Sequence, residues 1–479
     1  MNKTLNNIVI VNVLSVLSKV FLFLLALLIT NKLGTKSFGE YSTANTFLIM
    51  VMIFMSFGSN FLINREVAKD KDTGLWYLAH ISLIKFFVYV LLILLIYFFR
   101  SYLPFNHIAN KLVIIFTISV FFKSIQEQIF FYYQAIEKFT LYSLMNFLNN
   151  FFLYIGSFII LELSAKTDIL LIGYFHLVLQ VFFLILNQYL VRKFYIKQNV
   201  CSIKITISSL KDVIKRSLPF FISSVIGILF NRIDILMLAI MLNEKVVGYY
   251  NISYTLYEAL LIIPISVASV IFPKIIKSTN DIQETKSLIN SVIYHLVHLS
   301  IVICIGISIF AEKIIYWLFS SEQDAAVLCL QILVWGLLIQ CYSNVLGRVI
   351  YANNKEVFFM KIGTLSLAFN IILNLILIPK FSLYGSSIAT ILSFILSFIL
   401  QYYFVKRYIL GKNFSLFFDK RLLILIVLFT TICFLMLYLN IHIILSILVL
   451  ALVYILLIFG LRILDINLFS SLLIKQKKV

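Results

Sequence analysis

The stretch that decides the fold runs from residue 217 to residue 273 and opens with SLPFFISSVIGILFNRIDILMLAIML (217–242). It predicts two long apolar helices joined by a short turn at 243–248. Arg232, Asp234 and Glu258 lie inside these helices, and a charge at bilayer depth costs about 2.5–3.5 kcal/mol on insertion scales. Such side chains usually face a protein interior or a watery cavity, so we treat them as functional candidates.

The composition supports the same environment for the whole chain. Its 479 residues are 62% hydrophobic and 12% charged, whereas soluble domains carry about 25% charged residues. The apolar runs are too long for the strands of a membrane barrel. The first run, 8–30, is too long for a signal peptide and precedes no small-residue cleavage site, so we expect it to be the first span. The fold class predicted is an all-α integral membrane protein.

Apolar runs of about 20 residues, the length needed to cross a bilayer, recur about fourteen times. The longest hydrophilic stretch, 192–217, follows the sixth run, where a transporter built from two bundles would place its linker. We predict this organisation: an N-terminal six-helix bundle at 1–191, a cytoplasmic linker at 192–217, a C-terminal six-helix bundle at 218–410, and two additional helices with a cytoplasmic tail at 411–479.

The net charge of +19 is distributed unevenly over the loops. Lys and Arg concentrate in the loops on the side of the two termini, which predicts a multi-pass protein with both termini in the cytoplasm. No soluble domain could present a basic face to nucleic acid. The five cysteines have neither disulfide nor metal spacing, and no phosphate loop or H-E-x-x-H motif occurs. We therefore predict no cofactor, no metal and no catalytic residue.

A faint internal repeat links two predicted turns. LGTKSFGEY (33–41) aligns with LNEKVVGYY (242–250) at an offset of 209 residues, and Leu, Lys, Gly and Tyr coincide. Each copy joins the first two spans of a predicted half, so the halves share one orientation. Parallel repeats of this kind predict a pseudo-twofold axis along the membrane normal, with the substrate site between the halves.

Polar side chains that share a helix face inside the spans are the candidate site residues. Candidates for a cationic cavity are Lys19, Lys123, Arg232 and Arg348. Candidates for polar contacts in that cavity are Asn12, Gln126, Asn231, Tyr254, Asn370 and Asn374. Candidates for ion coupling are Glu127, Asp234 and Glu258.

Structural interpretations of the same residues stay open. Polar residues also hold helices together, at about 0.6 kcal/mol per contact, which applies to the Asn370 and Asn374 pair. Lys123 and Glu127, at i and i+4, can form a structural ion pair. Lys85, Lys361 and Arg348 lie nearer the predicted cytoplasmic ends, where long side chains can reach the interface. Asp234 and Glu258 can simply neutralise Arg232.

Several short motifs occur in a characteristic order over the first twelve predicted spans. They are Leu33-Gly34 with Gly39 and Tyr41, Gly58, Arg65-Glu66 with Ala68, Gln134-Ala135 with Glu137-Lys138, Ser217 with Pro219, Asp234, Gly248 with Tyr250, Phe272-Pro273, Asn370 with Asn374, Ile378-Pro379 and Tyr384-Gly385. In these motifs the sequence resembles the polysaccharide (O-antigen or capsule repeat-unit, Wzx-type) flippases of the multidrug/oligosaccharidyl-lipid/polysaccharide exporter superfamily.

The resemblance implies a V-shaped pair of bundles around a cationic cavity. It implies a polyprenyl-pyrophosphate-linked oligosaccharide as the substrate, flipped by alternating access, with the lipid tail left among membrane lipid. A polysaccharide polymerase or chain-length machinery would be the partner. Buried Lys and Arg suit a pyrophosphate, and Asn, Gln, Tyr and Ser suit sugar hydroxyls. The alternatives are a cation-coupled multidrug exporter of the same superfamily, which would favour acidic cavity residues, and a membrane polysaccharide polymerase or ligase, which would need a larger outward loop.

Overall fold

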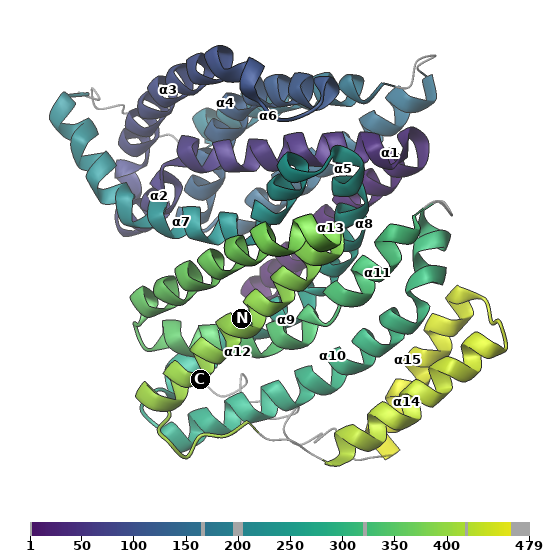
Figure 1. Ribbon diagram of the computed structural model, residues 1–479. Coiled ribbons are helices and arrows are strands. Elements are labelled where there is room, and N and C mark those ends of the chain that lie inside the picture. The colour runs from purple at the N-terminus through teal and green to yellow at the C-terminus, as the bar shows by residue number, and fades with distance from the viewer. Residues whose placement is uncertain (1, 164–167, 195–204, 320–322, 417–419, 461–479) are drawn as a thin grey trace. The chain divides into compact units, whose positions relative to one another are not determined.

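A computed structural model of the protein describes residues 2–163, 168–194, 205–319, 323–416 and 420–460 (Figure 1). Within these ranges every regular element is a helix, which confirms the predicted all-α class. The α-helices are α1 (Asn2–Ser56), α2 (Ser59–Lys69), α3 (Gly74–Phe99), α4 (His107–Ala135), α5 (Phe139–Leu163), α6 (Ile169–Phe194), α7 (Ile207–Met241), α8 (Glu244–Leu260), α9 (Ile262–Ser278), α10 (Ile282–Leu318), α11 (Asp324–Leu333), α12 (Gly336–Ala352), α13 (Glu356–Tyr408), α14 (Lys420–Tyr438) and α15 (Ile443–Gly460). Short 3₁₀ turns, η1 (Lys71–Thr73) and η2 (Arg100–Tyr102), flank α3.

Twelve helical segments of the described residues are long and apolar enough to cross a membrane. The helices α1 and α13, with 55 and 53 residues, are too long for one crossing, and each contains a non-helical residue near its middle. Counted as two segments each, they bring the apolar segments to fourteen. The protein is therefore a multi-pass membrane protein, while the number of spans stays a prediction.

The breaks in the long helices follow from backbone conformations. Gly34, in the first repeat segment, has a φ of 85° and interrupts α1. Gly58 has a φ of 69° and separates α1 from α2. A Cβ atom at Gly58 would lie 2.4 Å from the Ser217 carbonyl oxygen of α7, so glycine here also permits a close helix contact. The break in α13 falls at Ser382, which has a φ of 53°.

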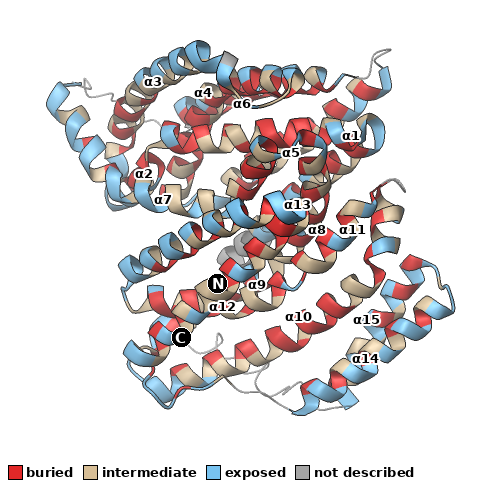
Figure 2. Ribbon diagram, in the orientation of Figure 1, coloured by how far each residue is buried: buried red, intermediate tan, exposed pale blue. Residues whose placement is uncertain are grey.

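The first compact unit comprises residues 1–252 together with residues 374–383 of α13. Within it α1 packs on α4, α5 and α7, and α4 packs on α6 and α2. Among the candidate membrane spans of this unit, helix α4 is the most enclosed. In its apolar stretch 56% of the residues are buried, against 11% in that of α3 (Figure 2). The core of this unit therefore lies along α4.

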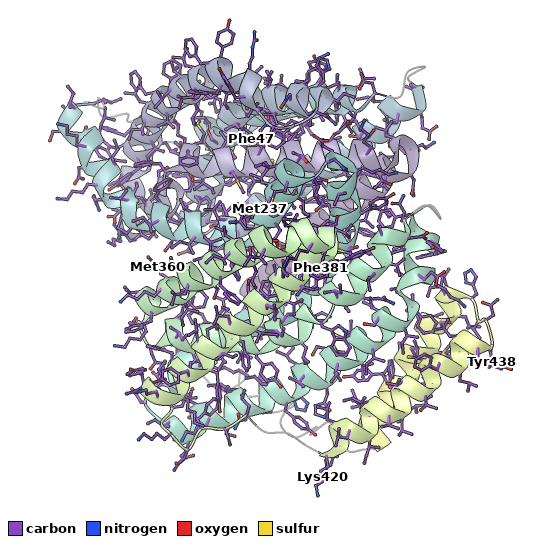
Figure 3. All side chains as sticks on the ribbon, in the orientation of Figure 1. Phe47, Met237, Met360, Phe381, Lys420 and Tyr438 are labelled. Atoms are coloured by element: carbon purple, nitrogen blue, oxygen red, sulfur yellow. The ribbon has the colours of Figure 1, made fainter. Side chains whose placement is uncertain are left out.

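The second compact unit comprises residues 253–373 and residues from 384 onward. Helix α10 packs on α11, α12, α14 and α15, and an apolar cluster that includes Phe310, Phe429 and Cys433 fills these contacts. Helices α14 and α15 pack on each other; Lys420 and Tyr438 mark the two ends of α14 in Figure 3. The division into bundles predicted from the sequence stays a prediction.

Candidate functional site

Asp234 of α7 is buried in the first unit, with 3% of its surface exposed, and both of its carboxylate oxygens accept hydrogen bonds. Asn374 of α13 donates from Nδ2 to Oδ1 at 2.8 Å. The Tyr250 hydroxyl of α8 donates to Oδ2 at 3.0 Å. The structure thus brings two predicted site residues together, Asp234 and Asn374, and adds Tyr250, which the sequence analysis noted in the repeat and among the resemblance motifs but not as a site residue.

A second cluster of charged residues surrounds Lys85 of α3. Its Nζ donates to Asn60 Oδ1 of α2 at 3.2 Å and to the Ser124 carbonyl oxygen of α4 at 2.6 Å. Glu127 interacts electrostatically with both Lys85 and Lys123. The expectation that Lys85 reaches the membrane interface is wrong: only 1% of it is exposed, because its ammonium finds acceptors on two neighbouring helices.

The remaining candidates in the first unit differ in accessibility. Asn12 and Lys19 of α1 are exposed, and Gln126 of α4 is fully buried. Asn231 of α7 is exposed and donates from its amide to the Gly227 carbonyl oxygen at 2.7 Å. Arg232 is half-buried.

The candidates in the second unit are Arg348, Tyr254, Glu258 and Asn370. Arg348 of α12 lies over the Phe272 ring, 5.5 Å from its centroid. Tyr254 of α8 is buried against Tyr257, Asn370 is buried, and Glu258 is half-buried. The roles predicted for these residues stay predictions.

The two repeat segments pack on each other within the first unit. A Cβ atom at Gly39 would lie 1.7 Å from the Glu244 carbonyl oxygen, and one at Gly248 would lie 2.1 Å from the Thr35 carbonyl oxygen. Both positions therefore require glycine for the backbones to meet this closely. The faint sequence repeat thus identifies two segments that are in contact.

Two buried carboxylates that sequence reasoning missed adjoin this contact. Glu40 of α1 accepts from Asn106 Nδ2 at 2.8 Å, and Glu244 of α8 accepts from the Asn106 backbone nitrogen at 2.7 Å. Asn106 also caps α4, since its side chain accepts from the Ala109 nitrogen. Glu40 and Glu244 both lie within the aligned repeat segments. Their place in the repeat is the sequence feature from which they could have been predicted.

The opposite end of α7 is held by an ion-pair network. Arg216 donates to Glu66 of α2 at 2.7 Å and to the Tyr77 hydroxyl of α3 at 3.0 Å. Burial raises the pKa of Glu66, but hydrogen bonds from Arg65 and Arg216 outweigh this effect, and the net result is a pKa below its ordinary value. Nearby, His80 of α3 shares a 2.9 Å hydrogen bond with Ser209 of α7.

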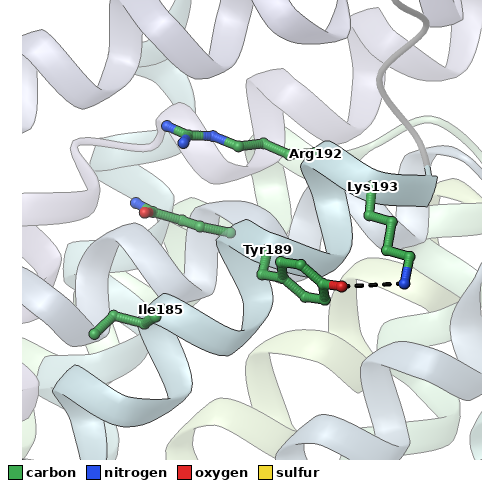
Figure 4. A pocket seen from close by; sticks show the side chains of 5 residues that line it. Ile185, Tyr189, Arg192 and Lys193 are labelled. Atoms are coloured by element: carbon green, nitrogen blue, oxygen red, sulfur yellow. Dashed lines mark hydrogen bonds between the residues drawn. The ribbon is translucent and has the colours of Figure 1, made fainter.

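A shallow pocket lies at the end of α6 and is lined by Ile185, Gln188, Tyr189, Arg192 and Lys193 (Figure 4). Lys193 donates to the Tyr189 hydroxyl at 3.0 Å. None of the candidate site residues lines this pocket. Its basic residues, Arg192 and Lys193, lie in the last turn of α6, on the predicted cytoplasmic side.

A protein-family model described as "Polysaccharide biosynthesis protein" matches residues 4–279, more than half of the chain. The chain belongs to this family. The match covers α1 to α9, which includes both repeat segments and the buried Asp234.

Curated relatives of this family member carry names of the same kind. It is 29% identical over 190 residues to a "Probable low-salt glycan biosynthesis flippase Agl15" of Haloferax volcanii, a match that spans 39% of this chain and 40% of that relative. It is 26% identical to the "Capsular polysaccharide biosynthesis protein CapF" of Staphylococcus aureus, over 85% of this chain and 100% of that relative. The resemblance to polysaccharide flippases of the exporter superfamily is confirmed.

Solved structures show the same fold at low identity. The family member superposes on the "Lipid II flippase MurJ, inward closed conformation" with a TM-score of 0.77 at 18% identity, covering 97% of this chain and 100% of that one. An inward-facing multidrug resistance MATE family transporter of the MOP superfamily gives a TM-score of 0.64 at 14% identity, covering 81% and 94%. These matches establish the membrane-transporter fold.

Proposed function

We propose that this protein moves polyprenyl-pyrophosphate-linked oligosaccharide repeat units across the bacterial cytoplasmic membrane for the assembly of O-antigen or capsule. The observation that carries the proposal is the family match over residues 4–279, together with relatives named as flippases and as a capsular polysaccharide biosynthesis protein. Both termini would lie in the cytoplasm, as the distribution of Lys and Arg over the loops predicts.

Intramembrane cations would hold the charged end of this substrate. A pyrophosphate needs positive partners at bilayer depth, and charge-assisted hydrogen bonds to phosphate are among the strongest in proteins. Lys19 and Asn12 are exposed on α1, so a head group can reach them without rearrangement of the helix. Lys123, Arg232 and Arg348 are the further cations assigned to this role, and the polar candidates would meet sugar hydroxyls.

Transport would proceed by alternating access. On the predicted outer side the repeat segments close through Gly39 and Gly248, while on the predicted cytoplasmic side α7 is held by the Arg216–Glu66 pair. Release of one contact while the other stays closed would expose the substrate to one side at a time. Asp234, held by Asn374 and Tyr250, is the candidate that would bind a coupling proton or cation; Glu127 and Glu258 are the other candidates.

The test is a gene deletion in the native host followed by analysis of lipid-linked saccharides. We expect complete repeat units to accumulate on the cytoplasmic face, and the wild-type gene to restore export. Lys19→Ala, Lys123→Ala and Arg232→Ala should each restore it poorly. Lys420→Ala, at the exposed start of α14, is the matched control and should restore it fully.

Other outcomes of the deletion would favour the alternatives. Single repeat units that reach the outer face but stay unpolymerised would indicate a polymerase or ligase. Unchanged surface polysaccharide together with increased sensitivity to cationic drugs would indicate a multidrug exporter. Full restoration by all three alanine variants would contradict the cationic binding site.

A further inference from the structure

A row of buried polar side chains runs along the face of α6 that packs on α4 and α5. His176, Gln180 and Asn187 share this face, since they lie at i, i+4 and i+11. All three are buried, His176 with 3% of its surface exposed. Gln180 donates from Nε2 to Asn149 Oδ1 of α5 at 3.4 Å. A polar row of this kind is unusual in the middle of apolar helices and needs a physical account.

Two contacts establish which residues of α4 face this row. The Phe116 ring packs on His176, with 5.0 Å between the ring centroids. About five turns further along α4, the Tyr133 hydroxyl donates to the Asn187 carbonyl oxygen at 3.4 Å. Lys123 lies seven residues after Phe116 and Gln126 seven residues before Tyr133, so both lie on the same side of α4 and between the two contacts. We call Lys123, Gln126, Asn149, His176, Gln180 and Asn187 the polar seam.

Several atoms of the polar seam have no hydrogen-bond partner among the described residues. They are both amide atoms of Gln126, Nδ1 of His176, Oε1 of Gln180 and Oδ1 of Asn187. A buried polar atom without a partner costs about 1–3 kcal/mol. Proteins usually satisfy such atoms with bound water, which makes about three hydrogen bonds per molecule. The seam offers both donors and acceptors, which suits water, and the nearby Lys123 disfavours a metal cation.

We propose that the polar seam binds a cluster of water molecules and that this cluster connects His176 with the Lys123–Glu127 pair as a proton-binding site of the first unit. Lys123 interacts electrostatically with both His176 and Glu127. Lys85 from α3 also acts on Glu127, and Glu127 in turn acts on Tyr142 from α5. A proton taken from bulk water by Glu127 leaves Lys123 and Lys85 with less compensating charge. If the protein works as proposed above, the loss of compensating charge strengthens the binding of an anionic head group. This consequence alone rests on the proposed function.

Hydroxyl-radical labelling of the purified full-length protein tests the water cluster without any substrate, because radiolysis of bound water oxidises neighbouring side chains. Phe116 should be oxidised severalfold faster than Phe429, which is also buried, with 2% of its surface exposed against 0% for Phe116, but lies in the apolar cluster of the second unit. The double variant Gln126→Leu/Gln180→Leu should reduce the oxidation of Phe116 to the level of Phe429. Thr117→Val is the control: Thr117 is buried on α4 and its hydroxyl already donates to the Val113 carbonyl oxygen, so this variant should label like wild type.

Equal oxidation rates of Phe116 and Phe429 in the wild type would overturn the proposal of a water cluster. The same holds if Phe116 is oxidised as fast in the double variant as in the wild type. The Tm of Gln126→Leu gives an independent reading. In a dry seam the substitution removes an unsatisfied amide and raises Tm, whereas in a hydrated seam it leaves water molecules with fewer partners and lowers Tm.

The proton-binding part has its own measurement. Proton uptake after a pH jump is followed with an impermeant indicator dye on the protein in detergent. Uptake should be smaller in Glu127→Gln and slower in Gln126→Leu/Gln180→Leu than in wild type. Identical uptake in all three proteins would overturn proton binding here. If the labelling and proton-uptake results are as expected but the protein transports no lipid-linked saccharide, only the proposed function is contradicted.

Discussion

Ser42 and Asn251 directly follow the two repeat segments at equivalent positions, 209 residues apart, and they hydrogen-bond to each other: Asn251 Nδ2 donates to Ser42 Oγ at 2.6 Å. Gly39 and Gly248, also 209 residues apart, lie beside them at positions where a Cβ would collide with the other segment. Equivalent residues of a repeat therefore meet. Under the proposed alternating-access cycle, this contact would open and close.

Substitution of Gly39 should weaken the contact between the repeat segments. A Cβ atom there would lie 1.7 Å from the Glu244 carbonyl oxygen, so the backbones must move apart. In a background without native cysteines, the yield of a disulfide between Ser42→Cys and Asn251→Cys reports the closed contact. Gly39→Ala should lower this yield severalfold. Gly227→Ala, where a Cβ meets nothing within 4 Å, should leave it unchanged, and equal yields in both variants would count against the glycine contact.

Loss of Asn374 should destabilise the protein through Asp234. Asn374→Leu removes the hydrogen bond from Asn374 Nδ2 to this buried carboxylate, and hydrogen bonds to charged groups contribute about 1.5–3 kcal/mol. We expect a drop of that order in the free energy of unfolding in detergent. Asp234→Asn combined with Asn374→Leu should cost less than the sum of the single changes, because the two residues are in direct contact. Strict additivity would show that the hydrogen bond contributes nothing.

Lys85 should stabilise the packing of α2, α3 and α4. Lys85→Met removes the donor to Asn60 Oδ1 and the side-chain donor to the Ser124 carbonyl oxygen, which keeps its backbone donor within α4. A buried acceptor left unpaired, here Asn60 Oδ1, costs about 1–3 kcal/mol. The thermal unfolding temperature should fall clearly. Lys361→Met, an exposed lysine on α13, should change it little. Similar temperatures for both variants would contradict a structural role for the buried ammonium.

The Glu66–Arg216 ion pair should make the free energy of unfolding depend on pH. The pKa of folded Glu66 lies below its ordinary value of 4.5, so its contribution is fully present above pH 4.5 and is lost as the pH falls through the lowered pKa. Wild-type protein should therefore be more stable than Glu66→Gln at neutral pH, and the difference should shrink in acid. Asp212→Asn, which removes the weaker and more exposed partner of Arg216, should show a smaller difference. A gap between wild type and Glu66→Gln that is the same at pH 7 and in acid would refute this account.

The apolar runs and the repeat predicted much of this architecture, because both depend on local composition and spacing. Gly34, Gly39 and Gly248 stand out in the sequence as members of the repeat, and Asp234 stands out as a charge inside an apolar helix. The partners of Asp234 and Lys85 do not, since Asn374 is 140 residues away from Asp234 and Asn60 and Ser124 carry no mark that distinguishes them from other small polar residues. Lys85 near a predicted helix end suggested an exposed side chain, and only the packing of α2 and α4 around it reveals burial.

The central claim is that this chain alone carries a lipid-linked saccharide across a bilayer, and purified protein in liposomes tests it most directly. Polyprenyl-pyrophosphate-linked repeat units are incorporated into both leaflets, and an enzyme added outside converts only those that it can reach. With the wild-type protein we predict conversion of nearly the whole pool, and with Lys19→Ala a much slower second phase. Conversion that stops at the outer leaflet, as in protein-free liposomes, would contradict the account.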